Sequence, residues 1–594
     1  MANLRTLLPY FRPYRKTFLL GLVLVIISNF FSTLGPRFLE RGIDALTRGA
    51  PFSEVRTTVV LLLATAALAG LARYGMRETL NSGSRWIEYD LRNDLFRHLQ
   101  RMSAEFYDRQ PTGDLMARAT NDLLAVRMAA GPAIMYMVDT LTRSLLVLPW
   151  MLRISPRLTL FALLPMLGLP LVMIFFGQAI HHRSLAIQDH FSVLTSFVHE
   201  NLSGVRIVRA YRQERAEIEH FRSLNEEYAS RNVALALASG AFHPLLGLMG
   251  SLGGIAVLYL GGRQVIAGSV TPGQFVAFGM YLVSLVWPMI ALGWVVNLVN
   301  RAEASMGRIN RLFAEQPTIT SPARPAAFPR GRAARSVTFE HVWFRYPNAP
   351  ERGWVLQDVS FHLDAGRSLA IVGPTGAGKS TLADLVTRAY DPERGRILIG
   401  GVDIRQLDLA DLRQVVGFVP QETFLFSETL ADNVLLGAPD DGRLERSAET
   451  AQLTEALPLL PRGFDTMLGE RGINLSGGQK QRTAIARALA HDPPVFVLDD
   501  ALSGVDAHTE ARILAGLRGA LTGRTSIIVS HRLAAVRDAD WIVVLDRGRI
   551  VEEGTHATLA GAAGRYWELL SRQQLEEELE GGEEPTAASA GTPG

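Results

Sequence analysis

The sequence predicts an α-helical membrane bundle in the first half of the chain and an α/β domain in the second. The chain has 594 residues, several times the length of an ordinary domain, so two or more units are expected. Apolar residues make up 48% of it, charged residues only 20%, and the mean hydropathy is +0.14. This composition argues against a disordered protein and indicates a membrane component. Uncharged stretches are confined to the first half, and short apolar runs alternating with helical patterns follow them.

Six stretches of the first half are expected to cross the membrane. Four are long enough to span the roughly 30 Å of hydrocarbon, for which about 20 apolar residues suffice. The other two are weaker, because the stretch at 57–72 is short and the stretch at 128–152 contains Asp139 and Arg143. The six lie at residues 17–36, 57–72, 128–152, 158–180, 232–262 and 264–300.

Basic residues set the expected orientation. Arg5, Arg12, Arg15 and Lys16 precede the first stretch without an acidic residue, and the connections at 81–130 and 181–231 hold seven arginines each. By the positive-inside rule all three segments lie in the cytoplasm. Six crossings return the chain to that side, so we expect a multi-pass protein of the cell membrane, whether inner or plasma membrane, with the second half cytoplasmic.

The two long connections are expected to reach far beyond the bilayer. If each folds as two helices of about 25 residues, at 1.5 Å per residue they project about 35 to 40 Å. Pro111 and Gly113 interrupt the first connection, and Gly204 interrupts the second. This pattern predicts two short turns placed where they could touch a soluble domain. The alternative is that Pro111 and Gly204 only interrupt helices, as in any loop.

Composition also divides the chain. We expect a membrane domain at 1–317, a Pro-, Ala- and Arg-rich linker at 318–335, an α/β domain at 336–575 and an acidic, disordered tail at 576–594, with a helix that continues through 573–584 as the alternative. Within the α/β domain, 368–372, 495–498 and 526–529 are expected strands, and 382–389 and 480–490 are expected helices. The absence of cysteine excludes disulfides and thiolate metal sites. The net charge of +2 gives no sign of a nucleic-acid partner.

The strongest motif follows the expected strand at 368–372 and fits G-x-x-x-x-G-K-[ST]. Strand, loop and helix come in the order that a phosphate-binding loop requires. The glycines let backbone N–H groups close around phosphates, Lys379 pairs with the β- and γ-phosphates, and the Ser380 hydroxyl ligates Mg²⁺. Downstream, Asp499 ends a buried apolar strand, as an aspartate that orients Mg²⁺ requires. The loop residues are Gly373, Pro374, Thr375, Gly376, Ala377, Gly378, Lys379 and Ser380, with Thr381 beside them.

A second motif, Leu475-Ser476-Gly477-Gly478-Gln479, lies between this loop and the strand at 495–498. It resembles the signature of ATP-binding-cassette (ABC) proteins, and Gln421, the segment 503–506 and His531 follow the family's order. The resemblance covers nearly the whole chain, because six crossings followed by one cassette resemble the half-transporters of multidrug-type ABC exporters, which work as dimers. It implies an ATPase that uses ATP and Mg²⁺ for transport. It also implies coupling helices around residues 111–115 and 202–210.

The resemblance assigns roles to further residues. Tyr346 looks like the aromatic residue that stacks on adenine, the alternative being a core tyrosine. Gln421 looks like the Mg²⁺ and water contact, against a plain surface glutamine, and His531 looks like the γ-phosphate contact, against a structural histidine. The signature residues Ser476, Gly477, Gly478 and Gln479 open a helix whose N–H groups suit the γ-phosphate held by the opposite subunit.

One position departs from the family pattern. Hydrolysis-competent members have a glutamate after the strand aspartate to polarise the attacking water, whereas this chain has Asp500. Its carboxylate is one methylene short, and a displacement of about 1 Å can cost on the order of 10²-fold in rate. We therefore expect a slow ATP site here and a non-identical second half-transporter that supplies the glutamate. A homodimer with two slow sites is the alternative.

The substrate is weakly specified. Asp139 and Arg143, four residues apart, share a helix face, so a mutual ion pair is the first interpretation and a substrate contact the second. The family resemblance suggests hydrophobic drugs, lipids or peptides, and a lipid flippase or an ATP-gated channel or regulatory subunit remain alternatives. Six further residues are candidates for a substrate cavity, with lipid-facing packing as the alternative for each: Asn29, Met135, Met137, Trp287, Trp294 and Asn297.

Overall fold

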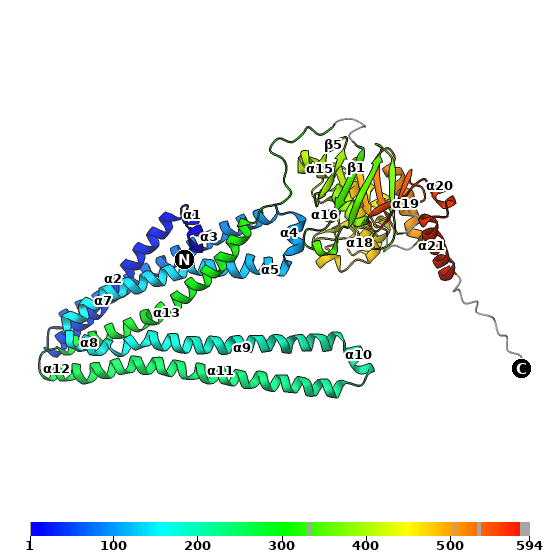
Figure 1. The fold of residues 1–594 in the computed structure, drawn as a ribbon. Helices are drawn as coiled ribbons and strands as arrows, with labels where there is room; N and C mark the ends of the chain where they lie inside the picture. Colours follow the sequence, from blue (N-terminus) through cyan, green and yellow to red (C-terminus); the bar gives the residue numbers. More distant parts are fainter. Residues whose placement is uncertain (1, 330–334, 503–506, 532–535, 582–594) are drawn as a thin grey trace, which may run out of the picture. The chain divides into compact units, whose positions relative to one another are not determined.

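The structure is a computed structural model that describes residues 2–329, 335–502, 507–531 and 536–581 (Figure 1). The chain divides into two compact units. One comprises Met1–Gln100 and Thr112–Glu315, and the other comprises Arg101–Pro111 and Gln316–Gly594. The first unit is helical and the second mixes helices with β-sheets, which confirms the predicted fold class.

Long helices build the first unit. Helix α2 packs against α3, α7 and α13, while α9 and α11 lie side by side as a hairpin with α10 at its tip (Figure 1). π-helical turns join α5, α6 and α7. The helices of this unit are α1 (Leu8–Phe11), α2 (Arg15–Thr47), α3 (Phe52–Leu99), α5 (Thr112–Ala117), α6 (Leu123–Met128), α7 (Ile134–Ile154), α8 (Pro156–Leu163), α9 (Leu169–Ser203), α10 (Val205–Ala210), α11 (Glu214–Ala256), α12 (Gly262–Ile266) and α13 (Pro272–Ala314).

Four helices of the described residues are long and apolar enough to cross a membrane: α2, α3, α11 with its continuation to Ile266, and α13. The other two expected crossings, 128–152 and 158–180, fall mainly on α7 and on α8 with the start of α9. Helix α3 has 48 residues, and at 1.5 Å per residue it measures about 72 Å, more than twice the roughly 30 Å of hydrocarbon. The long connections therefore are helical extensions, as predicted.

The two predicted turns are found, but the first was misplaced. The short helix of the first connection is α4 (Ala104–Arg109), ahead of the expected residues 111–115, which instead include the start of α5. Pro111 explains the end of α4, because a proline forces the preceding residue, Gln110, into an extended conformation. In the second connection, α10 follows Gly204 within the predicted range.

Two sheets form the framework of the second unit. An antiparallel sheet has the order β2-β1-β4-β5, and a mostly parallel one has the order β10-β9-β3-β8-β7-β6. The expected strands at 368–372, 495–498 and 526–529 are confirmed as β3, β7 and β8. The strands are β1 (Val337–Phe344), β2 (Leu356–Leu363), β3 (Ser368–Val372), β4 (Arg394–Ile399), β5 (Val402–Asp403), β6 (Val416–Val419), β7 (Val495–Asp499), β8 (Thr525–Val529), β9 (Trp541–Asp546) and β10 (Arg549–Gly554).

Helices complete this unit and confirm the two expected at 382–389 and 480–490. They are α14 (Lys379–Val386), α15 (Leu409–Val415), α16 (Leu430–Leu435), α17 (Arg443–Thr450), α18 (Gly477–Ala490), α19 (Ala507–Leu521), α20 (His556–Gly561) and α21 (Arg565–Gly581). Helix α21 reaches Gly581, so residues 576–581 follow the helical alternative and not the expected disorder. Leu, Gln and Glu dominate this stretch and are strong helix formers. Residues 582–594 lie outside the described part.

Candidate functional site

Most of the predicted site residues of the second unit gather at the carboxyl ends of neighbouring parallel strands; Tyr346 and the signature residues lie elsewhere. Strands β3, β8, β7 and β6 lie in this order in the sheet, so the segments that leave their ends lie side by side. Ligands of open α/β sheets bind at this edge. The segments carry the phosphate-binding loop after β3, His531 after β8, Asp499 and Asp500 at the end of β7, and Gln421 after β6.

Glycines give the loop after β3 its shape. Gly373 and Gly378 have φ angles of +151° and +101°, which favour glycine over other residues. A Cβ atom at Gly373 would lie 2.0 Å from the carbonyl oxygen of Leu545, and one at Gly378 would lie 3.0 Å from that of Val355. The loop can therefore turn tightly against the backbone at Leu545 and Val355. It leads directly into α14, whose first residue is Lys379.

The side chain of Lys379 folds back over the loop. Its Nζ atom donates to the carbonyl oxygens of Gly373 and Pro374, each at 2.9 Å. Burial lowers the pKa of Lys379, while the nearby Asp500 and Asp499 oppose that shift. An ammonium group beside a loop that contains no acidic residue is a donor set that fits a polyphosphate.

Ser380 and Asp499 form the oxygen pair expected for Mg²⁺. The Ser380 hydroxyl donates to Oδ1 of Asp499 at 3.1 Å, and Asp499 is only 4% exposed. Burial raises the pKa of Asp499, and the hydrogen bond from Ser380 opposes that shift. The described residues hold no cluster of three or more His, Asp or Glu suited to a metal. A pair of this kind fits Mg²⁺, which is usually held by few protein ligands together with phosphate oxygens and water.

Asp500 brings the predicted catalytic residues together. Its carboxylate Oδ1 lies 2.7 Å from Nδ1 of His531, and its Oδ2 accepts a hydrogen bond of 3.4 Å from Nε2 of Gln421. Asp500 has a left-handed backbone, with φ of +47°, and its N–H donates to the carbonyl oxygen of Val529. Both carboxylate oxygens therefore have a polar neighbour at the edge of the sheet.

Tyr346 is partly buried beside the loop. Its hydroxyl lies 2.9 Å from Oγ1 of Thr381, and its ring meets those of Phe344 and Tyr390 edge to face, with centroids 5.1 Å and 5.4 Å away. Burial raises the pKa of Tyr346. These contacts fix the ring next to the phosphate loop, where stacking on adenine stays a prediction.

The signature residues open α18 as predicted. Ser476 caps the helix: its Oγ accepts a hydrogen bond from the N–H of Gln479, whose side chain accepts one from the N–H of Ser476. Ser476 and Gly477 are exposed at the start of this helix. This helix start is available to a ligand outside the chain's own fold. The expected segment 503–506 lies outside the described residues.

Sequence reasoning missed a set of hydrogen bonds that joins the segment following Gln421 to α18. Arg487, near the end of α18, donates to the carbonyl oxygens of Asn433 and Phe424 at 2.8 Å and 3.0 Å. Asn433 is 1% exposed and bonds both backbone polar groups of Phe426. Burial lowers the pKa of Arg487. These hydrogen bonds tie the segment after Gln421 to the signature helix, and no local motif in the sequence signals them.

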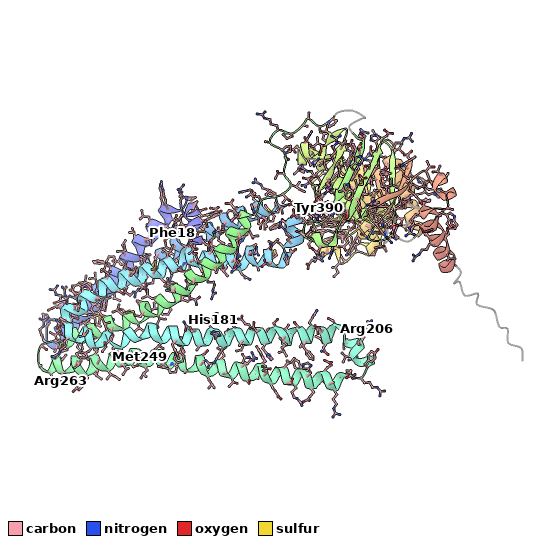
Figure 2. The ribbon with its side chains drawn as sticks, viewed as in Figure 1. Phe18, His181, Arg206, Met249, Arg263 and Tyr390 are labelled. Atoms are coloured by element: carbon pink, nitrogen blue, oxygen red, sulfur yellow. The ribbon has the colours of Figure 1, made fainter. Side chains whose placement is uncertain are left out.

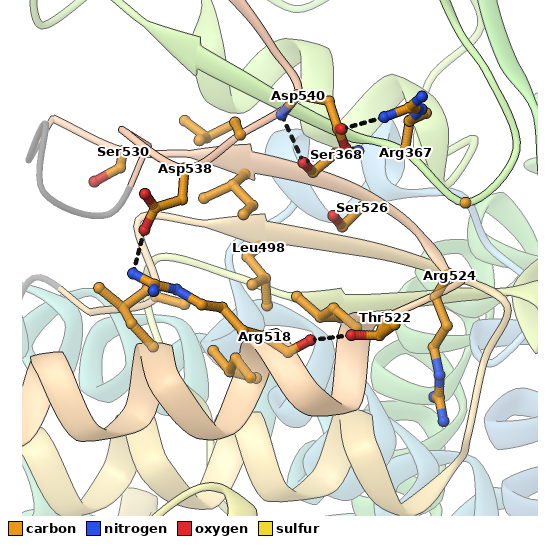
Figure 3. Close-up of a pocket in the computed structure, with 18 of the residues that line it drawn as sticks. Arg367, Ser368, Leu498, Arg518, Thr522, Arg524, Ser526, Ser530, Asp538 and Asp540 are labelled. Atoms are coloured by element: carbon orange, nitrogen blue, oxygen red, sulfur yellow. Dashed lines mark hydrogen bonds and ion pairs between the residues drawn. The ribbon is translucent and has the colours of Figure 1, made fainter. Parts of the chain in front are cut away.

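A separate cavity of about 290 Å³ lies between α19 and strands β3, β7 and β8 (Figure 3). Its lining includes Leu498, Ala501 and Ser530, which adjoin the site residues in sequence. An ion pair between Arg518 and Asp538 crosses one side of it. Among the described residues, none of the predicted site residues lines this cavity.

The membrane candidates separate into two groups. Asp139 and Arg143 form the ion pair given first place by the sequence, at 3.2 Å, and fully buried Asn29 bonds both Arg143 and the backbone of Asp139. Met135 is buried as well. The remaining four have exposed side chains: Met137, Trp287, Trp294 and Asn297. Asn29 and Met135 are therefore covered by neighbouring helices of this unit, and the exposed four remain candidates for a cavity or for the lipid face.

Comparisons with known proteins agree with this architecture. Residues 18–289 match the ABC transporter transmembrane region and residues 356–503 match the ABC transporter family. A probable multidrug resistance ABC transporter ATP-binding/permease protein of Bacillus subtilis, YheI, is 37% identical over 96% of this chain and 98% of its own length. The multidrug resistance-like ATP-binding protein MdlA of Escherichia coli is 36% identical over 96% of both chains.

Two further relatives extend this agreement. An ATP-dependent lipid A-core flippase of Syntrophus aciditrophicus is 32% identical over 98% of this chain and 96% of its own. The structure of a bacterial Atm1-family ABC exporter with ATP bound superposes with a TM-score of 0.75 and 27% identity, covering 94% of this chain and 99% of that one. With one membrane region followed by one cassette, the chain belongs to the ABC exporters, as a multi-pass half-transporter whose cassette is an ATPase that uses ATP and Mg²⁺.

Proposed function

We propose that the chain is one half of a heterodimeric exporter that moves hydrophobic or amphipathic compounds out of the cytoplasm, and that its own ATP site is slow. The observation that carries the proposal is the length of the Asp500 side chain together with its contacts. Its shorter carboxylate replaces the family's glutamate, and each of its two oxygens already has a polar neighbour, His531 or Gln421. A water molecule that is to be activated there must compete with both.

The chain's own loop is expected to bind ATP well. Lys379 would exchange the two carbonyl oxygens that it now contacts for phosphate oxygens, and Ser380, Asp499 and Gln421 would hold Mg²⁺. Bound Mg²⁺ neutralises charge on the β- and γ-phosphates. The other proposed ATP contacts are the loop residues at 373–378, Thr381, and Tyr346 at the base. We therefore expect this site to bind ATP without hydrolysing it quickly, because all of the ATP-binding groups are present and only the carboxylate that activates water, that of Asp500, is short.

Two surfaces support a second half-transporter. The start of α18 at Ser476 is exposed and presents N–H groups that suit the γ-phosphate of another cassette. Around α10, Leu202, Ile207 and Tyr211 are 70%, 66% and 73% exposed. Apolar side chains gathered at a cytoplasmic helix tip favour a protein partner. A non-identical partner with a glutamate at the position of Asp500 would give one fast and one slow site per dimer.

The ATP-loaded dimer of cassettes would shift the membrane domains toward an outward-open state, and hydrolysis at the fast site would reset them. The multidrug relatives support hydrophobic cargo. The exposed Met137, Trp287 and Trp294 support a wall that adapts to varied shapes, because methionine and aromatic rings accommodate different ligands. We place the protein in the cell membrane, inner or plasma membrane, with its N-terminus and cassette in the cytoplasm.

A lipid flippase is the second candidate, favoured by the 32% identity to the lipid A-core flippase. Proteoliposomes that contain the assembled transporter separate the two. ATP-dependent uptake of a hydrophobic dye or peptide into their lumen supports the exporter, whereas ATP-dependent movement of a labelled lipid between leaflets without such uptake supports the flippase. ATP-gated conductance in planar bilayers without either would reject both in favour of a channel.

A further inference from the structure

Helix α4, although it comes from the first cytoplasmic connection, belongs to the cassette. Residues Arg101–Pro111 group with the second unit of the chain. Phe106 of α4 is 4% exposed, and Ala104 packs against the apolar core of this unit, to which both sheets contribute. The side chain of Asn348 also donates to the carbonyl oxygen of Glu105 at 3.1 Å. The helix is therefore seated on the cassette by apolar and polar contacts together.

One hydrogen bond between α4 and the cassette involves a residue close to the phosphate loop. The Tyr390 hydroxyl donates to Oδ2 of Asp108 on α4 at 2.5 Å. Tyr390 is 8% exposed and follows α14, the helix that begins at the phosphate loop. Burial, and then the bond to Asp108, raise the pKa of Tyr390. The hydroxyl consequently stays protonated and remains a donor at physiological pH.

The ring of Tyr390 continues the path. It meets the ring of Tyr346 at 89° with centroids 5.4 Å apart, a favoured edge-to-face geometry. Tyr346 in turn bonds Thr381, which directly follows Ser380 of the phosphate loop. Three contacts thus connect Asp108 on α4 with Tyr346, the residue proposed to stack on adenine, and with Thr381 at the start of α14.

The family resemblance already assigns coupling to this connection; we propose that in this chain Tyr390 is the positioning residue for it, because through Asp108 it keeps α4 in register with Tyr346 at the base end of the chain's own ATP site. This step rests on the proposed function for the role of Tyr346 at the base. It gives the slow site a task that needs no hydrolysis, since a bound base can hold Tyr346, Tyr390 and α4 in one arrangement. The arrangement would pass to the membrane domain through the chain on either side of α4.

Two conservative variants test the contact in the assembled transporter in proteoliposomes. Tyr390→Phe keeps the ring and removes the donor, and Asp108→Asn removes the charged acceptor. We expect the substrate transported per ATP hydrolysed to fall at least about fivefold in each, with the KM for ATP changed less than about twofold. The double variant should be no worse than either single variant, because the two groups form one interaction.

Tyr566→Phe is the matched control. Tyr566 is also a buried tyrosine of the cassette, and its hydroxyl bonds Nδ1 of His556 at 2.8 Å. If all three variants lower ATPase activity and transport in the same proportion, the contact of Tyr390 is only structural. An unchanged transport-to-ATP ratio in both Tyr390→Phe and Asp108→Asn would also overturn the proposal.

A distance measurement keeps the test independent of transport. The chain has no cysteine, so two introduced cysteines are its only sites for spin labels. They are Arg109→Cys on α4 and Arg352→Cys in the rest of the cassette. We expect a narrow distance distribution with ATP that broadens in Tyr390→Phe. A distribution that stays equally narrow refutes the positioning role. Failure of the unmodified transporter to move any cargo would instead count against the proposed function.

Discussion

Replacing Asp500 with glutamate should turn the slow ATP site into a fast one. The added methylene advances the carboxylate by about 1.5 Å. It would carry the acid past its present neighbours, His531 at 2.7 Å and Gln421 at 3.4 Å, toward the water that must attack. A misplacement of about 1 Å can cost on the order of 10²-fold, so Asp500→Glu should raise the hydrolysis rate at this site by a similar factor. This corresponds to about 2.7 kcal/mol of activation free energy.

The assay isolates this site within the complex. The second half-transporter would carry glutamine in place of its catalytic glutamate, so that phosphate release reports hydrolysis at the phosphate loop of this chain. Asp500→Asn, with nearly the same shape and no charge, should abolish the remaining activity. The left-handed backbone at position 500 suits aspartate better than glutamate, so thermal unfolding must accompany the rates. A folded Asp500→Glu variant no faster than the parent would refute the reasoning.

Three further predictions concern the cassette. Lys379→Ala should weaken ATP binding by about tenfold or more, because hydrogen bonds to charged groups contribute about 1.5 to 3 kcal/mol; titration with a fluorescent ATP analogue checks this, and unchanged affinity would contradict it. Ser476→Ala should remove a helix cap that contributes about 1 kcal/mol and slow ATP hydrolysis at the partner's loop, while ATP binding to this chain's own loop, measured separately, stays the same. Burial, followed by the charges of Asp499 and Asp108, raises the pKa of Asp384 from its ordinary value of 3.8 to about 6. Between these two pH values the folded state binds more protons than the unfolded state, so the free energy of unfolding falls as the pH rises through this window. Asp384→Asn should remove up to about 3 kcal/mol of this loss and raise the melting temperature at pH 7, and a variant that melts lower there would contradict the assignment.

The sequence was most informative where one chemical task fixes residue types at a fixed spacing. Cradling phosphates requires glycines followed by Lys379 and Ser380, and the structure places them on one tight loop before α14. The signature was equally readable, because Ser476 with Gln479 three positions later is also a helix-capping pattern.

Features that depend on tertiary packing could not be read from local pattern. The approach of His531 to Asp500 follows from the neighbouring positions of β8 and β7 in the sheet, which a single sequence does not reveal. The proline at position 111 marked a turn correctly, yet its effect on the preceding residue placed the short helix ahead of it. The bond of Tyr390 to Asp108 joins residues 282 positions apart, and neither residue stands out in its own segment.

The pairing of a slow site with a second subunit is tested most directly by the composition and ATPase rate of the purified transporter. The chain would be expressed alone and together with a candidate second half-transporter, and the mass of each complex measured in detergent alongside its turnover. We predict fast turnover only in a one-to-one complex, lost when the second subunit's catalytic glutamate is replaced. A homodimer of this chain that hydrolyses ATP rapidly, and loses that activity on Asp500→Asn, would contradict the account.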